Sequence, residues 1–207
     1  KNLIQIIKKT VGSSNSKYFS DEHLPEIQNI VAQKPGKVLI GPGLGRNEKT
    51  IAFTQQFLAN FEGDCVIDAD ALFALSHSSK IEKPAKSRWI LTPHPGELHS
   101  LLNADISNDF DRFTRVSEFS KTFNATVVSK GFPCIITDVN ERAFITSYDT
   151  RIFSRAGFGD VLAGKIGGNL LISNDPNSAC LNALLEGKQK ADDLVHDNHP
   201  LEPLDLI

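Results

Sequence analysis

Methionine is missing from all 207 residues, and cysteine, tyrosine and tryptophan are scarce. The three cysteines, Cys65, Cys134 and Cys180, are odd in number, far apart and set in apolar surroundings, which favours reduced thiols in a core over disulfides or a metal site. His196 and His199 lie near the end of the chain, and we assign them to a solvated tail rather than to a metal site. We expect no protein metal site.

Long apolar runs and an excess of charge are also missing. No run approaches the roughly 20 residues that a membrane-spanning helix needs, and no secretory leader is recognisable at the N-terminal end. The formal net charge is −3, and the largest basic cluster is the pair Lys8-Lys9. Since nucleic-acid binders carry a basic patch or stripe, we expect a cytoplasmic protein with no membrane and no nucleic-acid partner.

The composition is that of a globular protein with a sizeable core, with 40% hydrophobic and 23% charged residues. After a polar opening stretch, short apolar segments alternate with helix-like segments. The expected strands are 37–40, 65–67, 89–91, 126–129, 134–137 and 143–146. The expected helices are 48–61, 71–75, 98–102, 109–123, 161–171 and 177–195. This order predicts a single α/β domain over 1–207, with a mostly parallel central sheet, helices on both faces, a late β-hairpin and a tail at 196–207.

Polar or glycine-rich segments follow the first two expected strands, and ligands of such sheets bind beyond the carboxyl ends of the strands. The segment Gly41-Pro42-Gly43-Leu44-Gly45 lacks the spacing of the dinucleotide fingerprint, and the sequence has no Walker A motif. Asp68 and Asp70 follow the second strand. They are suited to Mg²⁺, a ribose or an amide, although strand-end aspartates also serve as plain helix caps.

The third and fourth strands are followed by a histidine loop and a lysine. His94 and Glu97 are metal-ligand types, but the proline and glycine between them prevent a continuous helical face, so we favour a loop that orients a substrate. The alternative is a structural histidine with a capping glutamate. The pair Lys130-Gly131 follows the fourth strand, where an ammonium can reach phosphate oxygens and glycine lets a nucleotide pass close to the backbone. The alternative there is an ordinary surface lysine.

The sharpest candidate site is Gly157-Phe158-Gly159-Asp160 at the start of a small-residue helix. Glycine N–H groups and the helix dipole predict a hole for a phosphate or a transition-state anion. Asp160 can accept the proton of an attacking hydroxyl beside the point where phosphoryl charge is stabilised. A simple capping role for Asp160 is the alternative. The pattern favours phosphoryl transfer from a nucleotide to a hydroxyl, with Asp160 as the base.

Taken in order, five motifs resemble the NAD(P)H-hydrate dehydratase family: 41–45, 68–72, 91–97, 130–131 and 156–164. The resemblance covers about 38–194 and implies a ribokinase-like three-layer sandwich. It implies an enzyme, a carbon-oxygen lyase of metabolite repair. In that family a nucleotide phosphorylates the 6-hydroxyl of the hydrated forms of NADH or NADPH, and loss of phosphate restores the intact cofactor.

The resemblance also implies residue roles. It makes Asp160 the catalytic base and Gly157 and Gly159 the donors of the anion hole. The nucleotide side comprises Lys130, Gly131, Phe132, Pro133, Cys134 and Gly159. The hydrate side comprises Gly43, Gly45, Asp68, His94, Glu97 and Asp160. Phe158 stands where the family usually has a small residue, and Arg155 precedes the loop.

The partners implied by the resemblance are the hydrated dinucleotide NADHX or NADPHX and an adenine nucleotide. ADP is favoured over ATP as the donor, because the Pro-His-Pro-Gly-Glu loop looks like the bacterial form, and Mg²⁺ is the implied cofactor. A homo-oligomer, commonly a tetramer, is implied as well. Two alternatives stay open: a ribokinase-like small-molecule kinase for a vitamin precursor or a sugar, and a nucleotide-binding relative that has lost catalysis.

Overall fold

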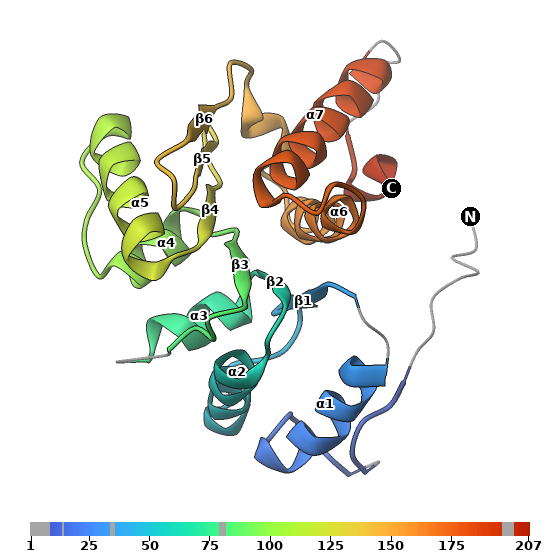
Figure 1. Cartoon of the computed structure of the whole chain (residues 1–207). Coiled ribbons are helices and arrows are strands. Elements are labelled where there is room, and N and C mark those ends of the chain that lie inside the picture. The colour runs from blue at the N-terminus through green and yellow to red at the C-terminus, as the bar shows by residue number, and fades with distance from the viewer. Residues whose placement is uncertain (1–8, 14, 34–35, 79–81, 196–200) are drawn as a thin grey trace.

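The computed structural model describes residues 9–13, 15–33, 36–78, 82–195 and 201–207. Its six strands form one sheet in sequential order (Figure 1). The strands are β1 (Val38–Ile40), β2 (Asp64–Ile67), β3 (Arg88–Leu91), β4 (Thr126–Ser129), β5 (Ile135–Thr137) and β6 (Ala143–Ile145). Strands β1 to β4 are parallel, whereas β5 and β6 form an antiparallel hairpin against β4.

Seven α-helices and three short 3-10 helices are found among the described residues. The α-helices are α1 (Leu24–Gln33), α2 (Glu48–Asn60), α3 (Asp70–Ser76), α4 (Pro95–Leu102), α5 (Asp109–Phe123), α6 (Phe158–Ser173) and α7 (Pro176–Val195). The 3-10 helices are η1 (Asp21–His23), η2 (Thr150–Phe153) and η3 (Pro203–Leu206). None of the helices in the described ranges is long and apolar enough to cross a membrane.

Strands β2 and β4 are buried along their whole length and β3 except at Arg88, whereas Leu39 of the edge strand β1 is exposed. In β2, Cys65 and Ile67 share a core cluster with α2 and α3, whereas Val66 between them belongs to the cluster of α6 and α7. This alternation follows because successive side chains of a strand point to opposite faces of the sheet. Figure 1 accordingly shows α2 and α3 on one side of β1 to β3 and α6 and α7 on the other. The expected three-layer α/β sandwich with a late hairpin is confirmed.

The element boundaries differ from the expectation mainly at helix starts. Helix α4 begins at Pro95 rather than at 98, because a first-turn proline lacks only an N–H that the helix would not use. Helix α6 begins at Phe158 rather than at 161, directly after Gly157 with a φ of 95°. The polar opening stretch contains α1, which was not predicted; Leu24 is its one buried residue, and Ile27 packs against the same core cluster.

The expected tail is only partly described. Residues 196–200, with His196 and His199, lie outside the described residues. Residues 201–207 pack back onto the domain instead of extending from it. Helix η3 contacts α6 and α7, and Leu206 is buried. The segment therefore belongs to the packed structure and lies against the helix that carries Asp160.

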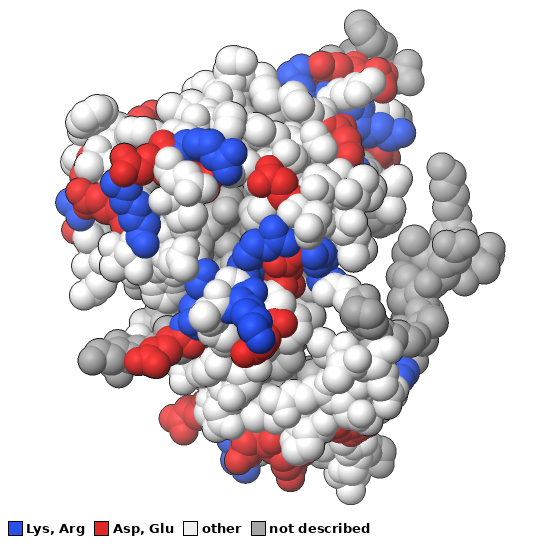
Figure 2. Space-filling model, in the orientation of Figure 1, with Lys and Arg blue, Asp and Glu red and all other residues white. Residues whose placement is uncertain are grey.

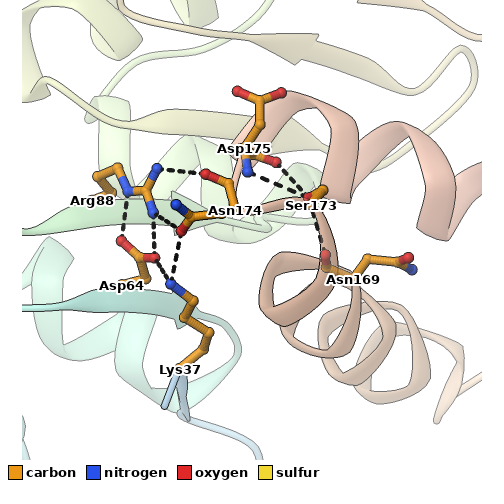
Figure 3. A network of polar contacts seen from close by, with 7 residues as sticks. All are labelled: Lys37, Asp64, Arg88, Asn169, Ser173, Asn174 and Asp175. Atoms are coloured by element: carbon orange, nitrogen blue, oxygen red, sulfur yellow. Dashed lines mark hydrogen bonds and ion pairs between the residues drawn. The ribbon is translucent and has the colours of Figure 1, made fainter. Parts of the chain in front are cut away.

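A charged cluster ties the amino ends of three strands to the C-terminal end of α6 (Figure 3). Asp64, only 7% exposed, accepts hydrogen bonds from Arg88 at 2.6 and 2.5 Å and from Lys37. Arg88 and Lys37 also donate to the side-chain oxygen of Asn174 at 2.8 and 3.1 Å, and Arg88 donates to its carbonyl at 2.8 Å. Asn174 is the left-handed C-cap of α6. This clamp fixes where α6 lies on the sheet.

The pKa of Asp64 follows from this clamp. Burial by itself raises the pKa of the carboxyl, but hydrogen bonds and charges from Arg88 and Lys37 outweigh it, so the pKa lies below its ordinary value. A carboxyl with a lowered folded-state pKa stabilises the fold fully above its unfolded pKa. That stabilisation is lost as the pH falls through the folded pKa.

We expect Asp64→Asn to lower the free energy of unfolding at neutral pH by about 1–3 kcal/mol, because two cations lose their buried partner. The difference from wild type should shrink as the pH falls below about 4, the ordinary range of an aspartate. Urea unfolding at neutral pH and below about pH 4 measures the two differences in stability. Glu62→Gln, which removes one charge from the exposed Lys86–Glu62 pair, is the control and should change stability by less than about 0.5 kcal/mol. Equal effects of the two variants would contradict the clamp.

Candidate active site

A cavity of about 510 Å³ opens beyond the carboxyl ends of β2, β3 and β4. Its walls are the segments that follow these strands, η2 with the loop to α6, the first turns of α6, part of α7, and Leu206. The volume is that of a small-molecule site. On the face of the molecule drawn in Figure 2, basic and acidic side chains are interspersed, without a continuous patch of either sign.

Close contact between the loops after β1 and β2 explains the first glycine motif. The Asp68 N–H donates to the Ile40 carbonyl at 3.1 Å. Gly41 has a φ of 128°, and a Cβ there would lie 1.7 Å from the Asp68 carbonyl oxygen, so only glycine fits. The next residue, Ala69, lines the cavity with a φ of 49°. That conformation costs a non-glycine residue about 1–3 kcal/mol, and such strain clusters at functional sites.

Lys130 lies between two carboxylates and a helix N-terminus. Its ammonium donates to Asp68 Oδ1 at 2.9 Å and lies 3.9 Å from Glu97 Oε2. A Cβ added to Gly159 would be 3.3 Å from Lys130 Nζ, so the ammonium lies against the first turn of α6. The Asp68 side chain is 2% exposed and that of Lys130 is 19% exposed. Lys130 is therefore not an ordinary surface lysine.

The first turn of α6 faces the cavity with free donors. Gly157 is the N-cap, so no side chain caps the helix. The N–H groups of Gly159 and Asp160 in the first turn have no acceptor within the helix. The exposed Asp160 carboxylate lines the cavity and takes no hydrogen bond or ion pair from the described part of the chain. Asp160 is thus not a helix cap, and its carboxylate is available to a ligand.

Phe158 departs from the small residue that the resemblance implies, and the structure shows where it goes. Its side chain is buried, and the ring packs edge to face on Phe153 with centroids 5.6 Å apart. Both residues belong to the cavity wall. The glycines on either side of Phe158 keep their place at the helix start.

His94 and Glu97 form a capping box at the start of α4. His94 Nδ1 accepts the N–H groups of Gly96 at 3.0 Å and Glu97 at 3.2 Å, and Glu97 Oε2 accepts the His94 N–H at 2.8 Å. An accepting Nδ1 places the ring proton on Nε2, 3.4 Å from Glu97 Oε1. The capping alternative thus describes their contacts, yet both side chains also line the cavity.

The loop between β4 and β5 is braced from behind. Arg112 of α5 is buried and donates to the Pro133 carbonyl at 2.6 Å, and one of its nitrogens lies 2.5 Å from where a Gly131 Cβ would be. Cys134 lines the cavity, but burial raises the pKa of its thiol to about 12. The thiol is therefore protonated at neutral pH and packs without acting as a nucleophile.

Most residues of the expected site meet in this one cavity. Those that line it are Gly131, Phe132 and Cys134 with Lys130, Gly157, Gly159, Asp160, Asp68, His94 and Glu97. Pro133, Gly43 and Gly45 are not among the described residues that line it. The Gly45 N–H instead donates to Asp70 Oδ2 at 2.9 Å, and the side chain of the next residue, Arg46, donates to Asp70 Oδ1.

Two further cations at the cavity, Arg151 and Lys165, were missed from the sequence, and Arg155, noted there only as preceding the glycine loop, lines the cavity as well. The guanidinium of Arg151 lies 4.8 Å from the ring centroid of Phe132. Each cavity cation is paired with a carboxylate: Arg151 with Asp149, Arg155 with Glu202, Lys165 with Glu186 and Lys130 with Asp68. The sequence gave no signal for Arg151, because an arginine in a connecting segment is common and only the tertiary structure places it at a cavity.

Comparison with known proteins identifies the class. Residues 3–207 match the family described as NAD(P)H-hydrate dehydratase, and the chain belongs to this family. The bifunctional NAD(P)H-hydrate repair enzyme Nnr of Salinibacter ruber is 31% identical over 82% of this chain and 32% of its own length. The ADP-dependent (S)-NAD(P)H-hydrate dehydratase of Neisseria meningitidis is 32% identical over 72% of this chain and 52% of its own.

Solved structures share the fold. An ADP/ATP-dependent NAD(P)H-hydrate dehydratase from Bacillus subtilis, co-crystallized with ATP/Mg²⁺, superimposes with a TM-score of 0.71 and 22% identity over 90% of this chain and 73% of that one. The expected ribokinase-like fold is confirmed. This chain spans about a third of the length of the bifunctional relative and about half of the ADP-dependent one.

Substitutions at two glycines of α6 distinguish an effect on ligand binding from an effect on helix stability. A methyl group at Gly159 would crowd Lys130 Nζ, whereas one at Gly168 meets nothing within 4 Å. We expect Gly159→Ala to weaken the binding of ADP several-fold, measured by equilibrium dialysis. Gly168→Ala should leave binding unchanged and raise stability by about 0.5–1 kcal/mol, because alanine favours helix over glycine. Unchanged ADP binding in Gly159→Ala would argue against a ligand at this helix start.

Proposed function

We propose that this chain dehydrates the hydrated forms of NADH or NADPH, using a nucleotide as phosphoryl donor. The observation that carries the proposal is the convergence of the Lys130 ammonium, the N-terminus of α6 and the Asp160 carboxylate on one cavity. Phosphoryl transfer is catalysed chiefly by positioning and by stabilising the charge on the transferred group. A cation, free N–H donors and a base side by side meet those needs.

In the proposed reaction, the hydroxyl oxygen on C6 of the hydrated ring attacks the terminal phosphorus of the donor. Asp160 takes the hydroxyl proton, and the bond from that phosphorus to the shortened nucleotide breaks. The N–H groups of the Gly157–Gly159 turn and Lys130 stabilise the charge on the transferred group. Phosphate then leaves C6 with its bonding electrons while the neighbouring carbon loses a proton, which restores the ring double bond.

The two ligands would meet at Asp160 from opposite sides. The nucleotide lies along Lys130, Gly131 and Phe132, with Pro133 and Cys134 continuing that loop. Asp68, His94 and Glu97 face the hydrate, and contacts of Gly43 and Gly45 with it stay a prediction. Within this cavity Lys130 is already ion-paired with Asp68, so the ligand binds a cation that is held in place. A pre-positioned group loses less freedom on binding.

Relatives and the residues of the cavity support the proposed donor and metal. The Neisseria relative is named as ADP-dependent, and the Bacillus protein was crystallised with ATP and Mg²⁺. The cavity offers Asp68 and Asp160 as oxygen ligands, and no group of three acidic, His or Cys side chains suited to a metal occurs among the residues described. Mg²⁺ would therefore be held mainly by the nucleotide phosphates, whose charge it neutralises. A single domain that assembles as a homo-oligomer is part of the same proposal.

Asp160→Asn tests the base. We expect the variant to lose about 10²–10⁴-fold in turnover while it still binds ADP, because the amide cannot take the hydroxyl proton. The measurement is the return of the near-ultraviolet absorbance of reduced nicotinamide from NADH hydrate with Mg²⁺ and either ADP or ATP. No return of absorbance with wild type, with phosphate left on another acceptor, would favour a kinase. Binding without any turnover would favour a relative that has lost catalysis.

Lys130→Met separates ligand binding from stability. The variant should bind ADP weakly and lose about 3–5 kcal/mol of stability, because the buried Asp68 loses its ion-pair partner. Adding Asp68→Asn should restore much of the stability but none of the ADP binding. Urea unfolding and equilibrium dialysis measure the two effects. Recovery of ADP binding in the double variant would mean that Lys130 acts only on the fold.

A further inference from the structure

Residues 201–207 lie over the start of the helix that carries Asp160. A Cβ at Gly157 would be 3.1 Å from Pro203 Cγ, and Leu206, 6% exposed, lines the cavity. Helix η3 in this segment packs against α6 and α7. The segment therefore closes one side of the cavity at the point where the free N–H donors of α6 are found.

A single ion pair joins this segment to the loop before α6. Arg155 Nη1 donates to Glu202 Oε1 at 2.9 Å and to the Leu201 carbonyl at 3.3 Å. The Arg155 and Glu202 side chains are 56% and 59% exposed. Exposed pairs of this kind contribute only about 0–1 kcal/mol. A phosphate group, which guanidinium binds through paired hydrogen bonds, can therefore compete with Glu202 for Arg155.

The partners of the other three cavity cations are held differently. Asp68, the partner of Lys130, is buried at the end of β2. Glu186 belongs to α7, and its pair with Lys165 joins two packed helices. Asp149 and Glu202 are the N-caps of η2 and η3, but Asp149 also accepts the backbone N–H of its own partner, Arg151, at 2.9 Å. Of these four carboxylates, only Glu202 lies in 201–207, whose described residues form no strand and no α-helix, so its displacement costs the contacts of η3 and Leu206 but no sheet pairing.

We propose that residues 201–207 act as a strap that competes with a phosphate-bearing ligand for Arg155. In this structure Glu202 holds Arg155, and the strap covers the start of α6. When a nucleoside diphosphate binds, its phosphates take Arg155, and repulsion between phosphate and Glu202 releases the strap. The inference takes from the proposed function only that the ligand carries phosphates, and it requires no chemical step.

By linkage, whatever weakens the strap must strengthen ligand binding. Glu202→Gln removes the competing charge, and we expect it to tighten ADP binding about two- to ten-fold, which corresponds to the small energy of an exposed pair. Glu62→Gln is the matched control, since it removes the same charge from an exposed pair outside the cavity, and it should leave ADP binding unchanged. Arg155→Gln should weaken binding, and adding Glu202→Gln to that variant should change binding no further. Equilibrium dialysis of the full chain measures the wild type, the three single variants and the double variant.

A label on the strap reports its release directly. The three native cysteines are buried, so Ile207→Cys, at an exposed position, takes a thiol-reactive dye selectively. ADP or pyrophosphate should lower the dye's anisotropy, whereas adenosine, which lacks phosphate, should not. Three outcomes would overturn the inference. The first is that adenosine releases the strap, the second is that Glu202→Gln binds ADP no tighter than Glu62→Gln does, and the third is that the wild type binds neither ADP nor pyrophosphate. If the protein shows these effects but does not dehydrate NADH hydrate, the strap is supported and the proposed function is contradicted.

Discussion

The clamp of Asp64 with Arg88, Lys37 and Asn174 is the constraint on which the site depends. It holds the amino ends of β1, β2 and β3 against the C-terminal end of α6. Helix α6 has 16 residues and spans roughly 24 Å. Since one end is fixed, the other reaches the opposite edge of the sheet, where β2, β3 and β4 end. A charged cluster with no contact to the cavity thereby aims the N-terminus of α6 at it.

The cavity combines this helix end with cations that are already paired. Ion pairing keeps each cation in place before a ligand arrives, but it also obliges a phosphate to share or displace the partner carboxylate. The outcome depends on burial: a buried partner such as Asp68 cannot leave, because an isolated carboxylate is costly inside the protein. An exposed partner such as Glu202 is solvated once released. The same kind of contact is therefore permanent at Lys130 and reversible at Arg155.

Several residues combine a structural role with a place in the cavity wall. His94 and Glu97 satisfy the start of α4 and face the cavity with the rest of their side chains. Asp68 holds Lys130 through its side chain, and its backbone requires glycine at Gly41. Such double use explains why either interpretation of these motifs, capping or binding, was consistent with the sequence. Loss of stability and loss of binding must therefore be measured separately in their variants.

The sequence by itself determined the α/β class, most strands and helices, and the motifs that belong to the dehydratase family. Local periodicity and glycine spacing depend on neighbouring residues, and the motifs follow strands whose ends meet at one edge. The tertiary structure decided what depends on distant residues. It brought Arg155 and Lys165 to the cavity, returned 201–207 to the start of α6, and left Gly43 and Gly45 outside the lining. Those outcomes are contacts across long stretches of chain, and no local pattern encodes them.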